Sequence, residues 1–272
     1  MPTARLALAA AVVVGTLYAV GGSDTNNEIV NTFEAYDPET DTWTTKSPMP
    51  KARVYLAACA ISRILYAAGG ADKRGASDAL FAYDPVTDAW TKKADMRHKV
   101  SGLAVGVVHG ELYAVGGNNG NQVFKTVEAY DTAANTWTTE NPMPTARWGL
   151  AVGVVNGILY AVGGLGSRGP LNTVEAYDAA TNRWTSRAAM PTARFGLTVS
   201  VTNGKLYAIG GEGVGNYLDT VEAYDPATNT WTAKAAMPTA RFALASGVHN
   251  GTIYAVGGYS GDVLNTVEAF RP

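Results

Sequence analysis

Residues 143–164 read MPTARWGLAVGVVNGILYAVGG, and residues 1–22 read MPTARLALAAAVVVGTLYAVGG. By itself the N-terminal copy is typical of a secretory signal peptide, because Arg5 precedes an apolar run from Leu6 to Val14. The internal copy aligns with it without a gap, however, and a segment in the middle of a chain is not an N-terminal signal. We therefore expect residues 1–22 to be retained in the folded protein, as the start of a repeated sequence.

The repeat extends over the chain. Pairs of adjacent glycines recur every 47 or 48 residues, at Gly21–Gly22, Gly69–Gly70, Gly116–Gly117, Gly163–Gly164, Gly210–Gly211 and Gly257–Gly258. A tyrosine stands three residues before each pair, and EAYD or a variant of it follows. In the first five units a tryptophan comes seven residues after the tyrosine of that second motif. Self-similarity at this period indicates a repeat architecture.

One unit has the pattern of four short antiparallel strands. Residues 149–155 are apolar on both sides of the pleat, Asn156–Gly157 is a hairpin signal, and ILYAVGG follows as a second strand. The segment TVEAYD predicts a third strand and the tryptophan segment a fourth, whereas helical periodicity is absent. Alanine-rich first strands suit a crowded central axis, and tryptophans suit the rim where blades diverge. These features predict an all-β, six-bladed β-propeller.

The glycine pair, the tyrosine before it and the spaced tryptophan resemble the kelch repeat, and the resemblance covers essentially the whole chain. It implies a single kelch β-propeller over residues 1–272, built of four-stranded antiparallel blades. The expected blades span about 1–47, 48–94, 95–141, 142–188, 189–235 and 236–272.

The sixth unit is shorter than the others. It ends TVEAFRP, without a turn, a tryptophan or a fourth strand, and residues 1–5 already align with the loop that enters a first strand. We therefore predict a last blade of three strands that lacks its outer strand and exposes the third strand as an edge. Two alternatives stay open: a truncated chain, or a partner strand that pairs with this edge.

Composition and charge limit the classes of function. The net charge is −2 and no run of like charges occurs, which argues against nucleic acid as a partner. Glycines interrupt every apolar stretch before it reaches transmembrane length, so we expect no membrane association. Cys59 is the only cysteine, which excludes an internal disulfide and leaves the cellular compartment open.

No constellation of residues indicates catalysis. The histidines His98, His109 and His249 are scattered, and no group has the spacing of metal ligands. We expect His109 and His249 at equivalent turn positions of blades three and six. Cys59 lies in an alanine-rich strand, where a small apolar role is expected. The sequence thus predicts no catalytic residue, no metal site and no cofactor.

A binding site is sought where the copies differ, because repeated residues are explained by the fold. Two of the aromatic side chains outside the repeat pattern, Phe33 and Phe81, lie in third strands as packing variants. The others, Tyr55 and Phe124 among them, fall after PTAR or in the loop between second and third strands. Those two places share one end of a propeller. In the kelch adaptors of animal ubiquitin ligases, the residues after the loop arginine and after the glycine pair contact ligands. By that resemblance the candidate ligand-binding residues are Ser101, Asn118, Trp148, Phe195, Glu212, Phe242 and Tyr259, and Tyr217 is added as an aromatic residue of the same loops.

The candidates suggest an aromatic arc over blades four to six, with Glu212 as its charge and Tyr217 and Asn118 as polar groups. The alternative interpretation is that these aromatics only plug the channel. The repeated loop arginines are expected to anchor loops through carbonyl or carboxylate hydrogen bonds. Blade three departs from the pattern, since MRHKVSG places Val100 where the arginine belongs and groups three basic residues beside it.

The leading hypothesis is a non-catalytic scaffold that binds a protein segment or a glycan on the loop face. One alternative is a carbohydrate-active enzyme of the mutarotase or lyase type, which requires a buried polar cluster in the channel. Another is an engineered or recently amplified repeat without a selected ligand, because the copies are so similar.

Overall fold

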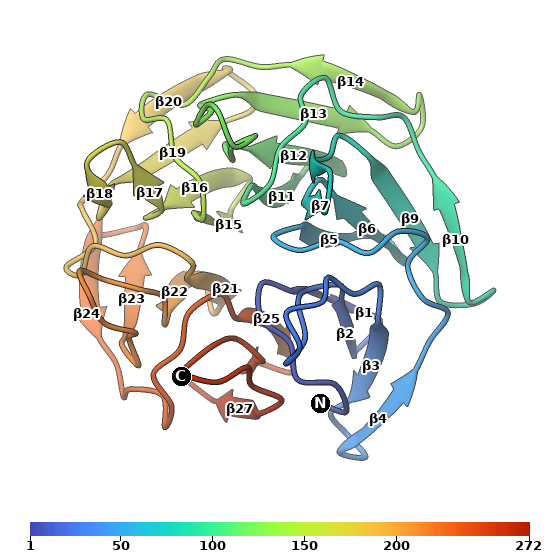
Figure 1. Cartoon of the computed structure of the whole chain (residues 1–272). Helices are drawn as coiled ribbons and strands as arrows, with labels where there is room; N and C mark the ends of the chain where they lie inside the picture. Colours follow the sequence, from blue (N-terminus) through green and yellow to red (C-terminus); the bar gives the residue numbers. More distant parts are fainter.

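The computed structural model describes all 272 residues, and the chain forms strands but no helix. Six antiparallel sheets stand in a ring around a central axis, as predicted (Figure 1). The first and last sheets close the ring, and there the N-terminal ammonium of Met1 donates to the carbonyl of Asn265 at 2.8 Å. No helix has the length and apolar character that a membrane span requires.

In each blade the strands run in chain order from the axis to the rim. The innermost strands are β1 (Ala9–Val13), β5 (Ala57–Ile61), β11 (Ala104–Val108), β15 (Ala151–Val155), β21 (Thr198–Thr202) and β25 (Ala245–His249). The second strands are β2 (Thr16–Val20), β6 (Ile64–Ala68), β12 (Glu111–Val115), β16 (Ile158–Val162), β22 (Lys205–Ile209) and β26 (Thr252–Val256). The third strands are β3 (Phe33–Asp37), β9 (Leu80–Asp84), β13 (Val127–Asp131), β19 (Val174–Asp178), β23 (Val221–Asp225) and β27 (Val267–Phe270).

The outer strands are β4 (Thr42–Thr45), β10 (Ala89–Lys92), β14 (Thr136–Thr139), β20 (Arg183–Ser186) and β24 (Thr230–Ala233). Two short hairpins lie in the loops between second and third strands: β7 (Ala71–Asp72) with β8 (Gly75–Ala76), and β17 (Leu165–Gly166) with β18 (Gly169–Pro170). Blade six consists of three strands, with β27 as its open edge, which confirms that prediction. Residues 1–22 supply β1 and β2, so the signal-like run is a strand of blade one.

The turn between the first two strands of a blade places two residues in the left-handed region. In blade four these are Asn156 (φ +50°) and Gly157 (φ +78°), and in blade three His109 takes the first position at φ +51°. The equivalent residue of blade six is Asn250, at φ +48°, while His249 is the last residue of β25. The expected equivalence of the two histidines is therefore wrong by one residue, because the residue before glycine sets the turn.

The glycine pairs join neighbouring blades. The N–H of the second glycine donates to a loop carbonyl of the next blade at 2.7–3.0 Å, and Gly258 closes the series by donating to Arg5. A Cβ on the first glycine of a pair would lie 2.6–2.7 Å from that same oxygen. Both glycines have positive φ. Backbone conformation and close approach thus both require glycine here.

Tyrosine and tryptophan fill the rim. The ring centroids of Tyr36 and Trp43 lie 5.1 Å apart, and the equivalent pairs of blades two to five lie 5.0–5.1 Å apart. In blades two to five the indole N–H also donates to a loop carbonyl of the preceding blade at 2.8–2.9 Å. The predicted rim position of tryptophan is confirmed, and in blades two to five the tryptophan hydrogen-bonds to the preceding blade.

The third-strand tyrosines predict loss of stability at alkaline pH. Burial is the main cause that raises the pKa of Tyr36 and Tyr130 to about 12, and it also raises the pKa of Tyr83 and Tyr177. An unfolded tyrosine titrates near pH 10, so the stability that these groups contribute is complete below pH 10 and is lost as the pH rises through 12. The buried arginines have the opposite effect on the pH dependence, because burial lowers their pKa and their contribution to stability increases as the pH rises. The effect is largest for Arg194, whose pKa burial lowers to about 10.

The tyrosines whose pKa is raised outnumber the arginines whose pKa is lowered. We therefore expect the urea concentration at the midpoint of unfolding to fall between pH 10 and pH 12. Tyrosinate absorbance should rise together with unfolding rather than before it. Tyr130→Phe removes one of these groups and should make the decline with pH less steep. A midpoint that stays constant through this range would contradict the expectation.

Candidate functional site

At one end of the channel each blade contributes a short segment after its loop arginine, or after Val100 in blade three. The second residue of this segment has a left-handed backbone in all six blades, with φ between +51° and +61°. We call these six residues the mouth ring: Ala7, Tyr55, Gly102, Gly149, Gly196 and Ala243.

The mouth ring is closed by hydrogen bonds. The N–H of each member donates to the carbonyl of the member in the preceding blade, at 2.7–2.9 Å, and the N–H of Ala7 donates to Ala243 to complete the circle. Every backbone N–H and C=O of the ring therefore has a partner. The opening presents side chains, not free backbone polar groups, to a ligand.

Side-chain sizes are matched around the mouth ring. A Cβ on Gly102 would lie 3.0 Å from the Trp148 ring, and one on Gly196 would lie 3.1 Å from the Phe242 ring. Each aromatic residue after an arginine thus covers the glycine of the preceding blade. Tyr55 is the one bulky member of the ring. In the next blade the position that holds the covering aromatic residue elsewhere is taken by the small Ser101.

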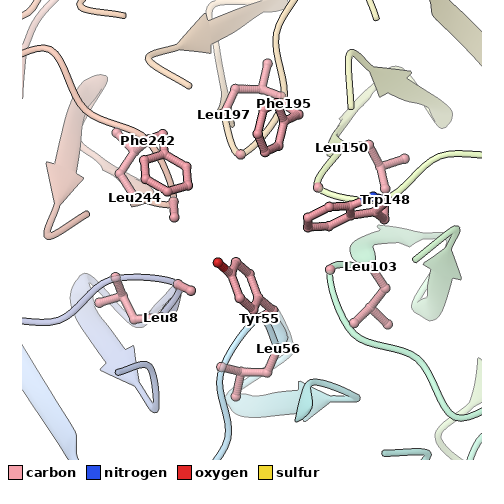
Figure 2. A pocket seen from close by; sticks show the side chains of 15 residues that line it. Leu8, Tyr55, Leu56, Leu103, Trp148, Leu150, Phe195, Leu197, Phe242 and Leu244 are labelled. Atoms are coloured by element: carbon pink, nitrogen blue, oxygen red, sulfur yellow. The ribbon is translucent and has the colours of Figure 1, made fainter. Parts of the chain in front are cut away.

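The mouth encloses an apolar cavity of about 100 Å³. Tyr55, Trp148, Phe195 and Phe242 surround it, as Figure 2 shows. One leucine per blade also lines it, with its side chain packed into the junction with the preceding blade: Leu8, Leu56, Leu103, Leu150, Leu197 and Leu244. Below the leucines the channel is lined mainly by alanine and valine, with Thr198 and Ser246 as hydroxyl groups.

The four aromatic rings are in contact with one another. The Tyr55 and Trp148 centroids lie 6.3 Å apart at 87°, Trp148 and Phe195 lie 5.8 Å apart, and Phe195 and Phe242 lie 6.3 Å apart. These side chains are half-buried. Burial, and then the negative charge of Glu212, raise the pKa of Tyr55, so its hydroxyl stays protonated at neutral pH.

The structure distributes the eight candidate residues over three places. Trp148, Phe195 and Phe242 line the cavity. Tyr217 stacks on Phe242 at 5.2 Å with an interplanar angle of 8°, and Tyr259 meets both rings edge-on. These five aromatics form one continuous surface over blades four to six.

The remaining three candidates are polar. Glu212 pairs through its backbone with Phe195 on one side and with Tyr217 on the other. Ser101 and Asn118 pair with each other in blade three, where the Asn118 amide donates to the Ser101 carbonyl at 3.4 Å. The residues after the arginine and after the glycine pair are bridge partners in every blade, so the two sets do share one end of the propeller.

The candidate set leaves out two parts of the cavity. Tyr55 is one residue further from its arginine than the other aromatics, and its left-handed backbone turns it into the opening (Figure 2). The lining leucines are the same in all six copies, so a search for differences between copies does not find them. Their signal was a leucine three residues after each loop arginine.

The loop arginines are structural, as expected. Arg147 is fully buried, donates to the carbonyls of Gly163 and Thr173 at 3.0 and 2.9 Å, and forms an ion pair with Glu175. Equivalent buried pairs occur in blades one and five, and blade six has the same pair with a half-buried Glu268. Burial is the first cause that lowers the pKa of Arg147, and the Glu175 charge opposes it.

Blades two and three replace this pair in complementary ways. In blade two Phe81 stands at the glutamate position, and the Arg53 guanidinium lies 5.3 Å from its ring centroid. In blade three Val100 stands at the arginine position, and Glu128 accepts from the Arg97 N–H at 2.8 Å and contacts the His98 ring. The basic segment of blade three therefore serves its own glutamate, outside the cavity.

No group of three or more His, Cys, Asp or Glu side chains is placed to hold a metal ion. Burial raises the pKa of the Cys59 thiol to about 12, which suits an unreactive side chain packed between strands.

A profile of the KLHDC2/KLHL20/DRC7 kelch-repeat domain matches residues 1–164 and again residues 102–272. The chain belongs to the kelch-repeat family. Among solved structures, one titled "Structure of YjhT" superposes with a TM-score of 0.85 over 99% of this chain and 95% of that chain, at 17% sequence identity. This likeness concerns the fold. No curated protein matches the sequence.

Proposed function

We propose that this kelch propeller is a non-catalytic binding scaffold whose ligand is a protein segment that inserts one apolar side chain into the channel mouth. The observation that carries the proposal is the cavity of about 100 Å³, which aromatic rings surround and one leucine per blade also lines. It is smaller than the ~150 Å³ apolar cavity that admits benzene. A branched aliphatic side chain therefore fits it better than an aromatic ring.

The polarity of the mouth favours a protein segment over a glycan. A sugar needs several hydrogen-bond partners besides an aromatic face. The backbone groups of the mouth ring are all paired, and the lining side chains carry polar atoms only on Tyr55 and Trp148. The aromatic surface around Tyr217 and Tyr259 extends the site beyond the cavity, where the rest of an extended segment can lie.

Selection from a random peptide library, displayed on phage and panned against the intact protein, tests the proposal. Peptides that share an aliphatic residue are expected, and Trp148→Ala should weaken their binding by about 10- to 100-fold, because a buried aliphatic side chain loses part of its apolar contact. Trp184→Ala is the matched control, since it removes a tryptophan of the same blade at the rim and should leave binding of the folded protein unchanged.

A glycan array probed with the same variants distinguishes the alternatives. Binding of a sugar that depends on Trp148, without peptide binding, would replace the protein segment by a carbohydrate ligand. Absence of any ligand in both screens would overturn the scaffold function and leave the aromatics as packing residues of the channel.

A further inference from the structure

The outer edge of blade six differs from that of every other blade. In blades one to five the first four residues of the third strand are buried under a fourth strand. In β27 Ala269 is exposed, and Val267, Glu268 and Phe270 are half-buried. This strand therefore offers an unpaired backbone edge next to an incompletely covered core.

A cavity lies beside this edge, between blades five and six. It has a volume of about 60 Å³ and is lined by Ile209, Met237, Ala235, Ala236 and Phe270, among others. At the other junctions within the chain a rim tryptophan packs into the corresponding core, such as Trp231 between blades four and five. The indole N–H of Trp231 donates to the Ala188 carbonyl, whose equivalent in blade five is Ala235. The cavity marks the place that a rim tryptophan occupies at the other junctions, and the Ala235 carbonyl stands where its indole N–H finds an acceptor.

The junction of blades six and one has unused groups on its other side. In blade two the Asp88 carboxylate accepts from the Ser47 N–H of the preceding blade at 3.1 Å, and Trp90 donates to the Ser47 carbonyl. In blade one Asp41 and Trp43 occupy the equivalent positions and make no such bond to blade six. A segment that ran along β27 and on toward Trp43 would supply both partners.

The residues at the end of β27 do not build the turn that leads into a fourth strand. In the first five blades a tyrosine hydroxyl at this strand donates to an Asp or Asn of the turn, as Tyr224 does to Asn229 at 2.7 Å. Next to it an aspartate caps the turn, as Asp225 does by accepting from the Ala227 N–H. Blade six has Phe270 and Arg271 instead. Both substitutions remove a turn-forming group, so these residues do not favour the turn that leads into an outer strand in the other blades.

We propose that the open edge of β27 binds an extended segment of a partner protein that carries a tryptophan in the register of the missing outer strand. The backbone of the segment pairs antiparallel with β27, as in other cases of strand addition. Its indole covers the cavity beside Phe270, half-buried like most rim tryptophans of the other blades, and donates to the Ala235 carbonyl. This site is at the rim, away from the channel mouth, and does not depend on the function proposed above.

A synthetic peptide of the chain's own residues 226–234, PATNTWTAK, is a suitable probe because it contains the whole of β24. We expect saturable amide shift changes of the ¹⁵N-labelled full-length protein at β27 and at residues 235–238. The same peptide with Trp231→Ala should bind about 30-fold more weakly, because a tryptophan at an interface is a typical hot spot. NMR titration detects binding even at millimolar dissociation constants, so a weak complex is still measured.

Two protein variants locate the site. Ala236→Glu places a carboxylate at the cavity and should abolish the shift changes at β27. Ala189→Glu changes the equivalent exposed residue of blade four and should leave them intact. The proposal is overturned if β27 does not respond, if the alanine peptide binds equally well, or if Ala236→Glu binds like the parent. A dimer in which β27 amides are already protected would assign the edge to a second copy instead.

Discussion

Glu175→Ala is expected to lower the free energy of unfolding by about 3–5 kcal/mol, one of the two largest losses we predict. The change leaves the Arg147 guanidinium fully buried, with two carbonyl acceptors but no negative charge beside it. It also removes the acceptor of the Thr145 hydroxyl, which donates to Glu175 at 2.7 Å. Because removing one partner of a buried pair strands the other, the cost exceeds the net contribution of the pair itself.

Glu175→Phe serves as the matched control, because it copies an arrangement that the chain already contains. In blade two Arg53 is buried without a glutamate and lies over the Phe81 ring. An aromatic face attracts a desolvated guanidinium by about 2 kcal/mol and also fills the volume of the lost carboxylate. We therefore expect Glu175→Phe to lose clearly less stability than Glu175→Ala.

Urea unfolding at neutral pH measures both variants against the parent protein. The alanine variant should also melt about 10 °C lower, given the size of the chain. Equal losses for alanine and phenylalanine would mean that the packed volume, not the stranded charge, sets the cost. If Glu175→Ala lowered the free energy of unfolding by less than about 1 kcal/mol, the pair would contribute no more than a surface ion pair, and the expectation from its burial would be wrong.

The architecture could be predicted because each copy of the repeat tests the others. Six glycine pairs, five tryptophans and a shorter sixth unit indicated the ring, the rim and the three-stranded last blade, and the structure confirms all three. The prediction for His249 was wrong by one residue, because the two histidines were aligned by their place between strands and not by their distance from the glycine of the turn. Registers that depend on a single turn residue are the weakest part of such a prediction.

The mouth of the channel was only partly predictable, and the reason is contact between blades. Sequence comparison identified Trp148, Phe195 and Phe242 because they differ from their counterparts. It gave Tyr55 no special role, because its side chain enters the opening only through a left-handed backbone, which the sequence of one blade does not reveal. The match of Gly102 to Trp148 similarly becomes visible only when two blades are placed side by side.

The exchange of partners within blades two and three was not predicted from the sequence either. Phe81 and Val100 look like two unrelated departures from the repeat, one in a strand and one in a loop. In the structure each stands where an arginine–glutamate pair occurs elsewhere, and each leaves one member to be compensated locally, by a ring or by His98 and Arg97. The pair is thus the unit of the repeat, not the single residue.

Gly210→Ala is expected to be as damaging as the loss of Glu175, with a decrease of about 4 kcal/mol or more in the free energy of unfolding. Gly210 has φ +61°, and a Cβ there would lie 2.7 Å from the Arg241 carbonyl oxygen and 3.0 Å from the Met237 methyl. That carbonyl also accepts the Gly211 N–H at 2.9 Å. The added methyl group must push the loop of blade six away and break this bond between blades.

Gly204→Ala separates the contact from backbone strain. Gly204 lies six residues earlier in the same blade with φ +70°, and a Cβ there meets nothing within 4 Å. Alanine already adopts φ +51° and +53° at Ala7 and Ala243, so this fold tolerates the left-handed conformation without glycine. Gly204→Ala should therefore cost only about 1–2 kcal/mol. If denaturation showed equal losses for both variants, strain alone would explain the glycine pairs; a larger loss for Gly210→Ala assigns them to the close approach of neighbouring blades.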